Sequence, residues 1–119
     1  MAMKLPGQIA ILRFPSVDLS EGKSRPVLLL AKAPGAYDDW LICMISSQVH
    51  QALSGIDEII DESDDDFENS GLKVTSVIRI NRVAVAASEA LQGAVGEISA
   101  ERLLRIRKRL ANWVLGTET

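Results

Sequence analysis

The sequence predicts a mainly β protein with one α-helix, arranged as a small, partly closed β-barrel with a C-terminal amphipathic helix packed across it. Short segments rich in β-forming residues, separated by turn signals, fill the first two-thirds of the chain, and one segment of helical periodicity ends it. The chain has 119 residues, of which 47% are hydrophobic. This is enough for one self-standing core, so we expect a single domain over residues 1–119.

The first strands are predicted from apolar runs that follow turn residues. Residues 8–14 follow a Pro-Gly pair and are rich in β-formers. Pro26 opens the continuous apolar run 27–31, which is typical of a strand buried on both faces because it lacks the alternation of a half-exposed strand. Residues 40–45 form the next apolar run, so we expect three consecutive strands.

An acidic segment interrupts this pattern. Residues 57–68 carry eight of the sixteen acids and no Lys or Arg. Because dense like charges oppose compaction, we expect a solvated loop around one short strand near 56–60, with a shield over the functional site as the alternative. Further strands are expected at 74–80, 83–86 and 94–98, with a short turn or helix at 88–91.

The end of the chain is predicted to be helical over 100–115. Ser99 is a suitable N-cap, and Gly116 is a suitable terminating residue. One face is apolar, with residues Leu103, Ile106, Leu110, Trp113 and Val114. The remaining surface is basic, with residues Arg102, Arg105, Arg107, Lys108 and Arg109. We expect this basic face to be solvated, with contact to RNA or a partner protein as the alternative.

The formal net charge of −3 conceals an uneven distribution. Outside residues 57–68 the chain has 13 basic and eight acidic residues, a balance of +5, so a nucleic-acid groove is compatible with the mild overall acidity. Cys43 is the single cysteine and His50 the single histidine, which excludes an internal disulfide framework and multi-histidine metal centres. Because no signal peptide or membrane-length apolar run is present, we expect a cytoplasmic protein without membrane contact.

Two polar motifs stand at the ends of neighbouring predicted strands. Lys23-Ser24-Arg25-Pro26 precedes the most apolar strand, and Ile45-Ser46-Ser47-Gln48 ends the next one. Antiparallel neighbours place the start of one strand beside the end of the other, so Arg25 can lie next to Ser46. A guanidinium group matches two phosphate oxygens and a hydroxyl adds a third contact, which predicts a phosphate-binding site. Phosphate-loop, dinucleotide-binding and serine-hydrolase motifs are absent from the sequence.

The candidate site residues also have structural interpretations. Arg25 can instead form a surface pair with Glu21 or Asp18, and the two serines can satisfy backbone groups at a strand end. His50 is either a solvated loop residue or a proton donor to a leaving oxygen.

The tryptophans and the cysteine favour packing roles. Trp40 and Trp113 fall at apolar periodic positions, which favours core or dimer packing over stacking on nucleic-acid bases. Cys43 is expected to be a small core hydrophobe.

Taken in order, five blocks of the sequence resemble the MazF/PemK toxin family over roughly residues 6–114. The blocks are Gly7-Gln8-Ile9, Lys23 to Leu30, Ile45 to Gln48, Phe67 to Leu72 with Ser76-Val77-Ile78, and Val95 to Ile98 before the C-terminal helix. Their order and spacing carry the resemblance, because no block is specific alone.

This resemblance implies an SH3-like barrel, a homodimer and a toxin of a type II toxin–antitoxin pair. The implied activity is metal-independent cleavage of single-stranded RNA, such as mRNA, in which the RNA's own 2′-hydroxyl attacks the phosphate and leaves a 2′,3′-cyclic phosphate. No cofactor is implied. The implied partner is a cognate antitoxin whose acidic, disordered tail crosses the RNA groove.

The family motifs also imply roles for individual residues. Arg25 matches the charge stabiliser and possible acid, and Ser46 matches the hydroxyl that orients the phosphate. Glu21, expected to be catalytic, is the nearest match to an acidic residue that several members carry in the loop before Arg-Pro. The residues expected to bind the substrate are Lys23, Ser47, Gln48 and His50.

Two departures from the family pattern leave the activity open. Gln8 stands where the family usually has Asp, and Ser46 stands where threonine is usual, which keeps the hydroxyl but loses the methyl that fixes its rotamer. The alternative function is therefore a non-enzymatic binding protein on the same fold, either gyrase-poison-like or catalytically weakened.

Overall fold

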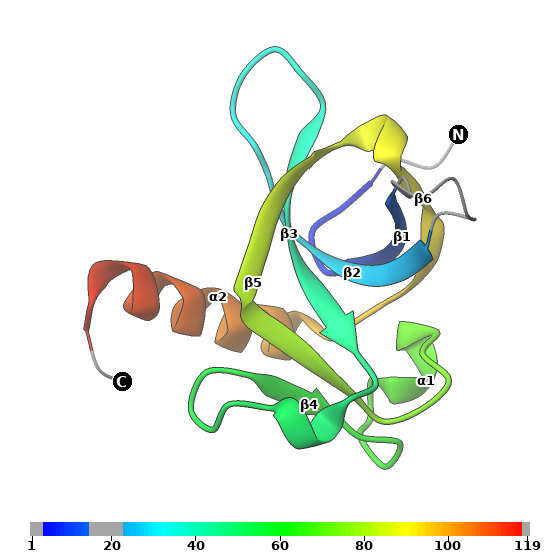
Figure 1. The fold of residues 1–119 in the computed structure, drawn as a ribbon, viewed down its shortest axis with the longest axis vertical. Helices are drawn as coiled ribbons and strands as arrows, with labels where there is room; N and C mark the ends of the chain where they lie inside the picture. Colours follow the sequence, from blue (N-terminus) through cyan, green and yellow to red (C-terminus); the bar gives the residue numbers. More distant parts are fainter. Residues whose placement is uncertain (1–3, 15–22, 118–119) are drawn as a thin grey trace.

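A single antiparallel sheet curls into a partly closed barrel, and a helix lies across its outside (Figure 1). The computed structural model describes residues 4–14 and 23–117. The six strands follow the order β4-β5-β3-β2-β1-β6 in the sheet. Their bounds are β1 Gln8–Phe14, β2 Lys23–Lys32, β3 Asp39–Ser46, β4 Glu58–Ile60, β5 Ser76–Ala87 and β6 Leu91–Glu97. The helices are η1 Val49–Gln51, α1 Phe67–Ser70, η2 Ser88–Ala90 and α2 Ala100–Leu115. The predicted fold class is confirmed.

Strand β2 is buried on both faces, as its continuous apolar run predicts. Leu28 and Leu30 face the helix and pack in one core cluster with Ile106 of α2. Val27 and Leu29 face the opposite way, into a second cluster that includes Trp40. Because successive side chains of a strand alternate between faces, an unbroken apolar run fills both cores at once. The first cluster is called the helix-side core and the second the barrel-side core.

Strand β5 is longer than predicted, because the expected strands at 74–80 and 83–86 are one strand of 12 residues. Its pairing with β3 shifts between Cys43 opposite Val83 and Met44 opposite Arg79, so residues 80–82 bulge out of the ladder. The carboxylate of Asp57 accepts a hydrogen bond of 3.1 Å from the Ile80 backbone N–H. A buried side chain therefore satisfies a donor that the bulge removes from the sheet.

Two glycines allow α1 to pack directly on β6. A Cβ atom at Gly96 would lie 2.2 Å from the carbonyl oxygen of Asn69. At Gly71, where φ is +74°, a Cβ atom would lie 2.2 Å from the carbonyl oxygen of Val95. Only residues without a side chain fit this close backbone approach.

Helix α2 has the predicted caps but buries less of its apolar face than expected. The hydroxyl of Ser99 accepts a hydrogen bond of 3.1 Å from the Arg102 backbone N–H, and Gly116 adopts the left-handed conformation. Ile106 is fully buried in the helix-side core. Trp113 is 48% exposed and Val114 is 71% exposed, so Trp113 is not in the core of the chain, and its other predicted role, packing in a dimer, stays a prediction.

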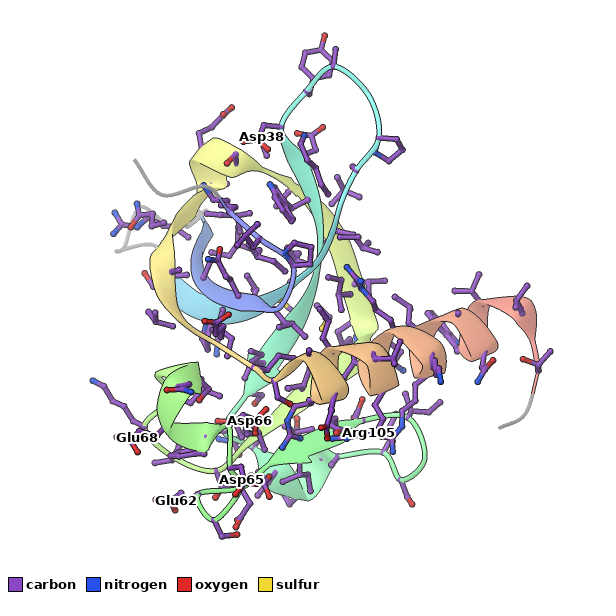
Figure 2. All side chains as sticks on the ribbon, turned by 180° about the vertical axis from the view of Figure 1, so that it is seen from behind. Asp38, Glu62, Asp65, Asp66, Glu68 and Arg105 are labelled. Carbon is purple, nitrogen blue, oxygen red and sulfur yellow. The ribbon has the colours of Figure 1, made fainter. Side chains whose placement is uncertain are left out.

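The acidic segment and the basic helix face form ion pairs with each other. The expectation that both are solvated is therefore wrong for the buried members of these pairs, Glu58, Asp66 and Arg102. Arg102 is 6% exposed and binds both carboxylate oxygens of Asp66, at 2.8 and 3.0 Å. It also binds Glu58 at 3.1 Å and Asp64 at 3.0 Å. Figure 2 shows Asp66 of the acidic segment and Arg105 of α2 where the segment faces the helix. Opposite charges from distant parts of the chain thus cancel the repulsion that the acidic run suggests.

Arg105 and Arg109 complete this ion network around Glu58. Both guanidinium groups contact its carboxylate, with Arg109 Nη1 at 3.0 Å. Other acids of the segment, Glu62, Asp65 and Glu68, are exposed at its outer edge (Figure 2). Arg107 lies apart from the network and donates to the carbonyl oxygen of Leu30 at 3.0 and 2.6 Å.

The ion network keeps both Asp66 and Arg102 in their charged forms. Burial opposes ionisation of Asp66, but the hydrogen bonds from Arg102 and the Ser99 backbone N–H outweigh it and hold the pKa of Asp66 below its usual value. Burial likewise opposes the charge on Arg102, but Asp66 and Glu58 outweigh it and raise the pKa of the guanidinium.

No helix in the described parts of the chain is long and apolar enough to cross a membrane.

Candidate functional site: an arginine-lined pocket on strands β2, β3 and β5

A surface pocket of about 330 Å³ lies where β2, β3 and β5 run side by side. It is lined by Arg25, Met44, Ile45, Ser46, Arg79 and Arg82. The pocket therefore brings together the predicted pair Arg25 and Ser46, and adds two arginines from β5.

Strand register explains why these side chains converge. Val27 of β2 pairs with Met44 of β3, which in turn pairs with Arg79 of β5. Directly opposed residues of antiparallel strands point to the same face, so these three side chains share a face. Continuing the β2–β3 register by two residues sets Arg25 opposite Ser46, on that same face. The two arginines thus flank the end of β3 from either side.

The Ser46 hydroxyl has a local role and, among the described residues, a hydrogen that no acceptor binds. Its oxygen accepts a hydrogen bond of 3.0 Å from the Gln48 backbone N–H, as the structural interpretation of this strand end predicts. A hydroxyl keeps its own hydrogen when it accepts. Ser46 can therefore donate to a phosphate oxygen while the Gln48 contact holds it in place.

Sequence reasoning missed Arg79 and Arg82. Arg79 is an arginine inside a β-branched strand, and its side chain is only 17% exposed. Its Nε atom lies 3.7 Å from Oδ2 of Asp57, and Nη1 donates to Oε1 of Gln51 at 3.3 Å. A charged residue within an apolar strand was the available signal, but its acidic partner lies in the segment expected to be solvated.

The other predicted site residues do not line the pocket in the described part of the chain. Ser47 and Gln48 follow Ser46 and are exposed, and His50 is exposed in η1. Lys23 begins β2, but its side chain lies outside the described residues. Glu21 lies in the part of the chain that the structure does not describe.

Two core predictions are confirmed. Trp40 is buried in the barrel-side core, and Cys43 is buried in the helix-side core. Burial, with a contribution from nearby Asp57, raises the pKa of the Cys43 thiol to about 12. The thiol is therefore neutral and has no role as a nucleophile in this state.

The chemistry of the pocket favours an anion. Among the residues that the structure describes, the lining includes three arginines and one hydroxyl and no acid. Guanidinium groups bind phosphate through paired hydrogen bonds, and they stabilise charge that develops on phosphoryl oxygens. Among residues 4–14 and 23–117, no group of three or more His, Cys, Asp or Glu side chains is placed to hold a metal ion.

Two other pockets of similar size suit an anion less well. One, of about 390 Å³, lies at the end of α2 beside Trp113, and its arginine, Arg109, already binds Glu58. The other, of about 370 Å³, lies at the start of α2 and is lined by Asp65, Asp66 and Glu97. The first has its cation engaged and the second is acidic.

Comparison with known proteins gives the same fold and one family. Among solved structures, the Mycobacterium tuberculosis toxin MazF-mt6 has a TM-score of 0.66 at 17% identity, with 94% of this chain and 99% of that chain covered. A MazE–MazF crystal structure from Deinococcus radiodurans has a TM-score of 0.67 at 18% identity, covering 99% and 100%. An endoribonuclease in complex with its cognate antitoxin, from a mycobacterial species, has a TM-score of 0.67 at 14% identity, covering 96% of each chain.

At these identities the structural matches establish the fold, and the family comes from the sequence. No curated protein matches the chain. The model of the PemK-like, MazF-like toxins of type II toxin–antitoxin systems matches residues 5–114, which is nearly the whole sequence. The resemblance seen in the five sequence blocks is thereby confirmed, and the chain belongs to the PemK-like, MazF-like toxin family.

Proposed function

We propose that this toxin is an endoribonuclease that cleaves single-stranded RNA without a metal ion, in the pocket formed by β2, β3 and β5. The observation that carries the proposal is the meeting of Arg25 and Ser46 in one arginine-lined pocket. The names of the structural neighbours, which include endoribonucleases, support this kind of activity.

In the proposed reaction the RNA supplies its own nucleophile. The 2′-hydroxyl oxygen attacks the adjacent phosphorus, the bond from phosphorus to the 5′-oxygen breaks, and a 2′,3′-cyclic phosphate and a 5′-hydroxyl form. Glu21 takes the proton of the 2′-hydroxyl, and Arg25 neutralises the charge on the phosphoryl oxygens and serves as the acid for the leaving oxygen. Ser46 donates to a phosphoryl oxygen and so fixes the angle of attack.

The residues outside the pocket are proposed to hold the RNA on either side of the reacting phosphate. Lys23 precedes Arg25 on β2, while Ser47, Gln48 and His50 follow Ser46 on the next segment.

Gln8, which stands where the family usually has Asp, makes one anchoring contact. Its side-chain oxygen accepts a hydrogen bond of 2.9 Å from the Leu5 backbone N–H. An amide oxygen can replace a carboxylate as an acceptor, so the family's usual Asp is not required for this contact.

The test is RNA cleavage in the presence of EDTA. A long single-stranded RNA should be cut by the wild type, and the product ends should carry 2′,3′-cyclic phosphates. Arg25→Ala and Ser46→Ala should each reduce the rate by roughly 10²- to 10³-fold, the loss seen when one donor to a developing oxyanion is removed. Lys108→Ala, an exposed change on α2, should leave the rate unchanged. Absence of cleavage by the wild type, or full activity of Arg25→Ala, contradicts the proposal.

Partners are proposed from the same family membership. We expect a homodimer and a cognate antitoxin, encoded next to the toxin gene and acting in the cytoplasm; structural neighbours include a MazE–MazF complex and a complex with an antitoxin. Light scattering should give twice the mass of the chain, and the adjacent gene product should co-purify with the toxin and suppress cleavage. A monomer, or a neighbouring product that does not bind, contradicts these expectations.

The second candidate is a barrel that acts only by binding another protein, as a gyrase poison does. The observation that favours it is the exposed apolar end of α2, where Trp113, Val114 and Leu115 are 48%, 71% and 74% exposed. Inhibition of DNA supercoiling without RNA cleavage would establish this candidate in place of the nuclease.

A further inference from the structure

The proposed reaction uses only one of the three arginines in the pocket. Arg25 comes from β2, whereas Arg79 and Arg82 come from β5. Strand β3, which carries Ser46, lies between them in the sheet. Because neighbouring strands are about 4.8 Å apart, the backbones of β2 and β5 are separated by about 10 Å. The cations thus stand on opposite sides of the Ser46 hydroxyl.

The side chain of Arg79 is held in place by Asp57 and Gln51. The carboxylate of Asp57 has no exposed surface and accepts two backbone hydrogen bonds, from Leu53 at 2.9 Å and from Ile80 at 3.1 Å. It therefore cannot rotate to follow Arg79, and it provides a fixed negative charge 3.7 Å from Nε. The side-chain oxygen of Gln51 accepts a hydrogen bond of 3.3 Å from Nη1 of Arg79.

This support leaves hydrogen-bonding capacity on the guanidinium of Arg79. At 3.7 Å the Asp57 contact is an ion pair and not a hydrogen bond. Among the residues that the structure describes, the buried Nε atom has no hydrogen-bond partner. Asp57 offsets one of the three positive charges around the pocket, so the described part of the lining keeps a positive excess. Such an excess suits a ligand with more than one negative charge.

We propose, building on the RNA cleavage proposed above, that Arg79 forms a second phosphate subsite in this pocket, with Arg82 beside it and Asp57 and Gln51 as positioning residues. The pocket then binds two successive phosphates of one RNA strand, the reacting one at Arg25 and Ser46 and its neighbour at Arg79. Its volume of about 330 Å³ is in the range of pockets that hold small organic ligands, so more than a single phosphate fits.

The first test measures the salt dependence of binding. The probe is a fluorescent single-stranded DNA oligonucleotide, which has the phosphates of RNA but no 2′-hydroxyl and so cannot be cleaved by the proposed route. Each phosphate contact on a single strand contributes about 0.7 to the slope of log affinity against log salt concentration. Arg79→Gln should therefore reduce the slope by about 0.7, whereas Arg79→Lys, which keeps the charge beside Asp57, should retain it.

Lys108→Gln is the matched control, because it removes one exposed positive charge from α2. It should leave the slope at the wild-type value. Thermal unfolding of each variant confirms that it is folded. A folded Arg79→Gln protein with the wild-type slope overturns the proposal.

A second test uses the wild-type protein and depends on no variant. Three nucleotides compete with the oligonucleotide: deoxyadenosine 3′,5′-bisphosphate, deoxyadenosine 5′-diphosphate and deoxyadenosine 5′-monophosphate. The bisphosphate places its charges at two separate points, whereas the diphosphate places a similar charge at one. With two subsites the bisphosphate should bind roughly tenfold more tightly than either of the others, as expected for one added set of charged hydrogen bonds. Equal competition by the diphosphate indicates bulk charge alone and overturns the proposal.

Both tests measure binding, so they separate this inference from the nuclease activity. A preference for the bisphosphate together with a lower slope in Arg79→Gln supports the second subsite even if no RNA is cut. RNA cleavage with no such preference and an unchanged slope supports the nuclease and overturns the second subsite.

Discussion

Replacing Arg102 by methionine removes the cation that joins helix α2 to the acidic segment. Arg102 is 6% exposed and binds the carboxylates of Asp66, Glu58 and Asp64 at 2.8 to 3.1 Å. Methionine keeps an unbranched apolar side chain in the site, so the change removes charge and hydrogen bonds more than volume. We expect Arg102→Met to fold with reduced stability.

The expected loss follows from which carboxylates are left unpaired. Glu58 keeps Arg105 and Arg109, whereas Asp66 keeps backbone N–H contacts, chiefly that of Ser99, and no cation among the described residues. Removing one partner of a buried ion pair costs roughly 3–5 kcal/mol. Because Glu58 remains paired, we expect the lower end, about 3 kcal/mol, which corresponds to a fall in Tm of about 12 °C for a chain of this size.

The stability lost in Arg102→Met should also depend on pH and should be smaller in acid than at neutral pH. In the wild type the pKa of Asp66 is below its usual value, so the stability that its ionisation contributes is present above about pH 4 and is lost as pH falls through the lowered pKa. In Arg102→Met the same carboxyl is buried without its cation, which raises its pKa and makes folding favour the protonated form. The difference in free energy of unfolding between the wild type and Arg102→Met should therefore be largest near pH 7 and should become smaller toward about pH 4.

Urea unfolding at both pH values measures this difference. Lys108→Met, on the exposed side of the same helix, is the control and should change stability by less than about 0.5 kcal/mol. If Arg102→Met is as stable as the control at pH 7, or if its deficit does not narrow in acid, the role given to the ion network is wrong.

Three further outcomes are expected from single sites. Ser99→Ala removes the α2 N-cap and should lower the free energy of unfolding by about 1 kcal/mol in urea; an unchanged midpoint argues against the cap. Gly96→Ala puts a Cβ atom 2.2 Å from the Asn69 carbonyl oxygen and should cost about 3 kcal/mol or more, so near-wild-type thermal unfolding contradicts the close approach of α1 and β6. Cys43, whose pKa burial raises to about 12, should resist a thiol reagent at pH 8 until the protein unfolds; rapid labelling of the native protein refutes this.

The elements that local pattern determines were predictable from the sequence. The apolar run of β2, the caps of α2 and the meeting of Arg25 with Ser46 follow from residue periodicity, capping chemistry and antiparallel register. The proposed reaction and the proposed antitoxin partner came from the resemblance to the toxin family, because no local pattern indicates them.

The features that were not predictable depend on pairing between distant residues. The acidic run contains no information about Arg102, which binds it from more than 30 positions away. Arg79 joins the pocket through the strand register that pairs it with Met44, and Arg82 lies in the bulge that follows. The position of such a bulge depends on both strands and on the buried carboxylate of Asp57, which accepts from the Ile80 backbone N–H. Trp113 has helical spacing, but the core that buries Ile106 does not include Trp113, which is 48% exposed.

The ion network between the acidic segment and α2 limits how pieces of this protein can be exchanged with those of its relatives. A C-terminal helix grafted from a relative without arginines at 102, 105 and 109 would leave Glu58 and Asp66 buried beside no cation. A foreign acidic segment without those carboxylates would leave the charge of Arg102 buried beside no anion. Functional chimeras should therefore arise when both segments are transferred together, and evolution should change them as a unit even though the pocket strand β5 lies between them.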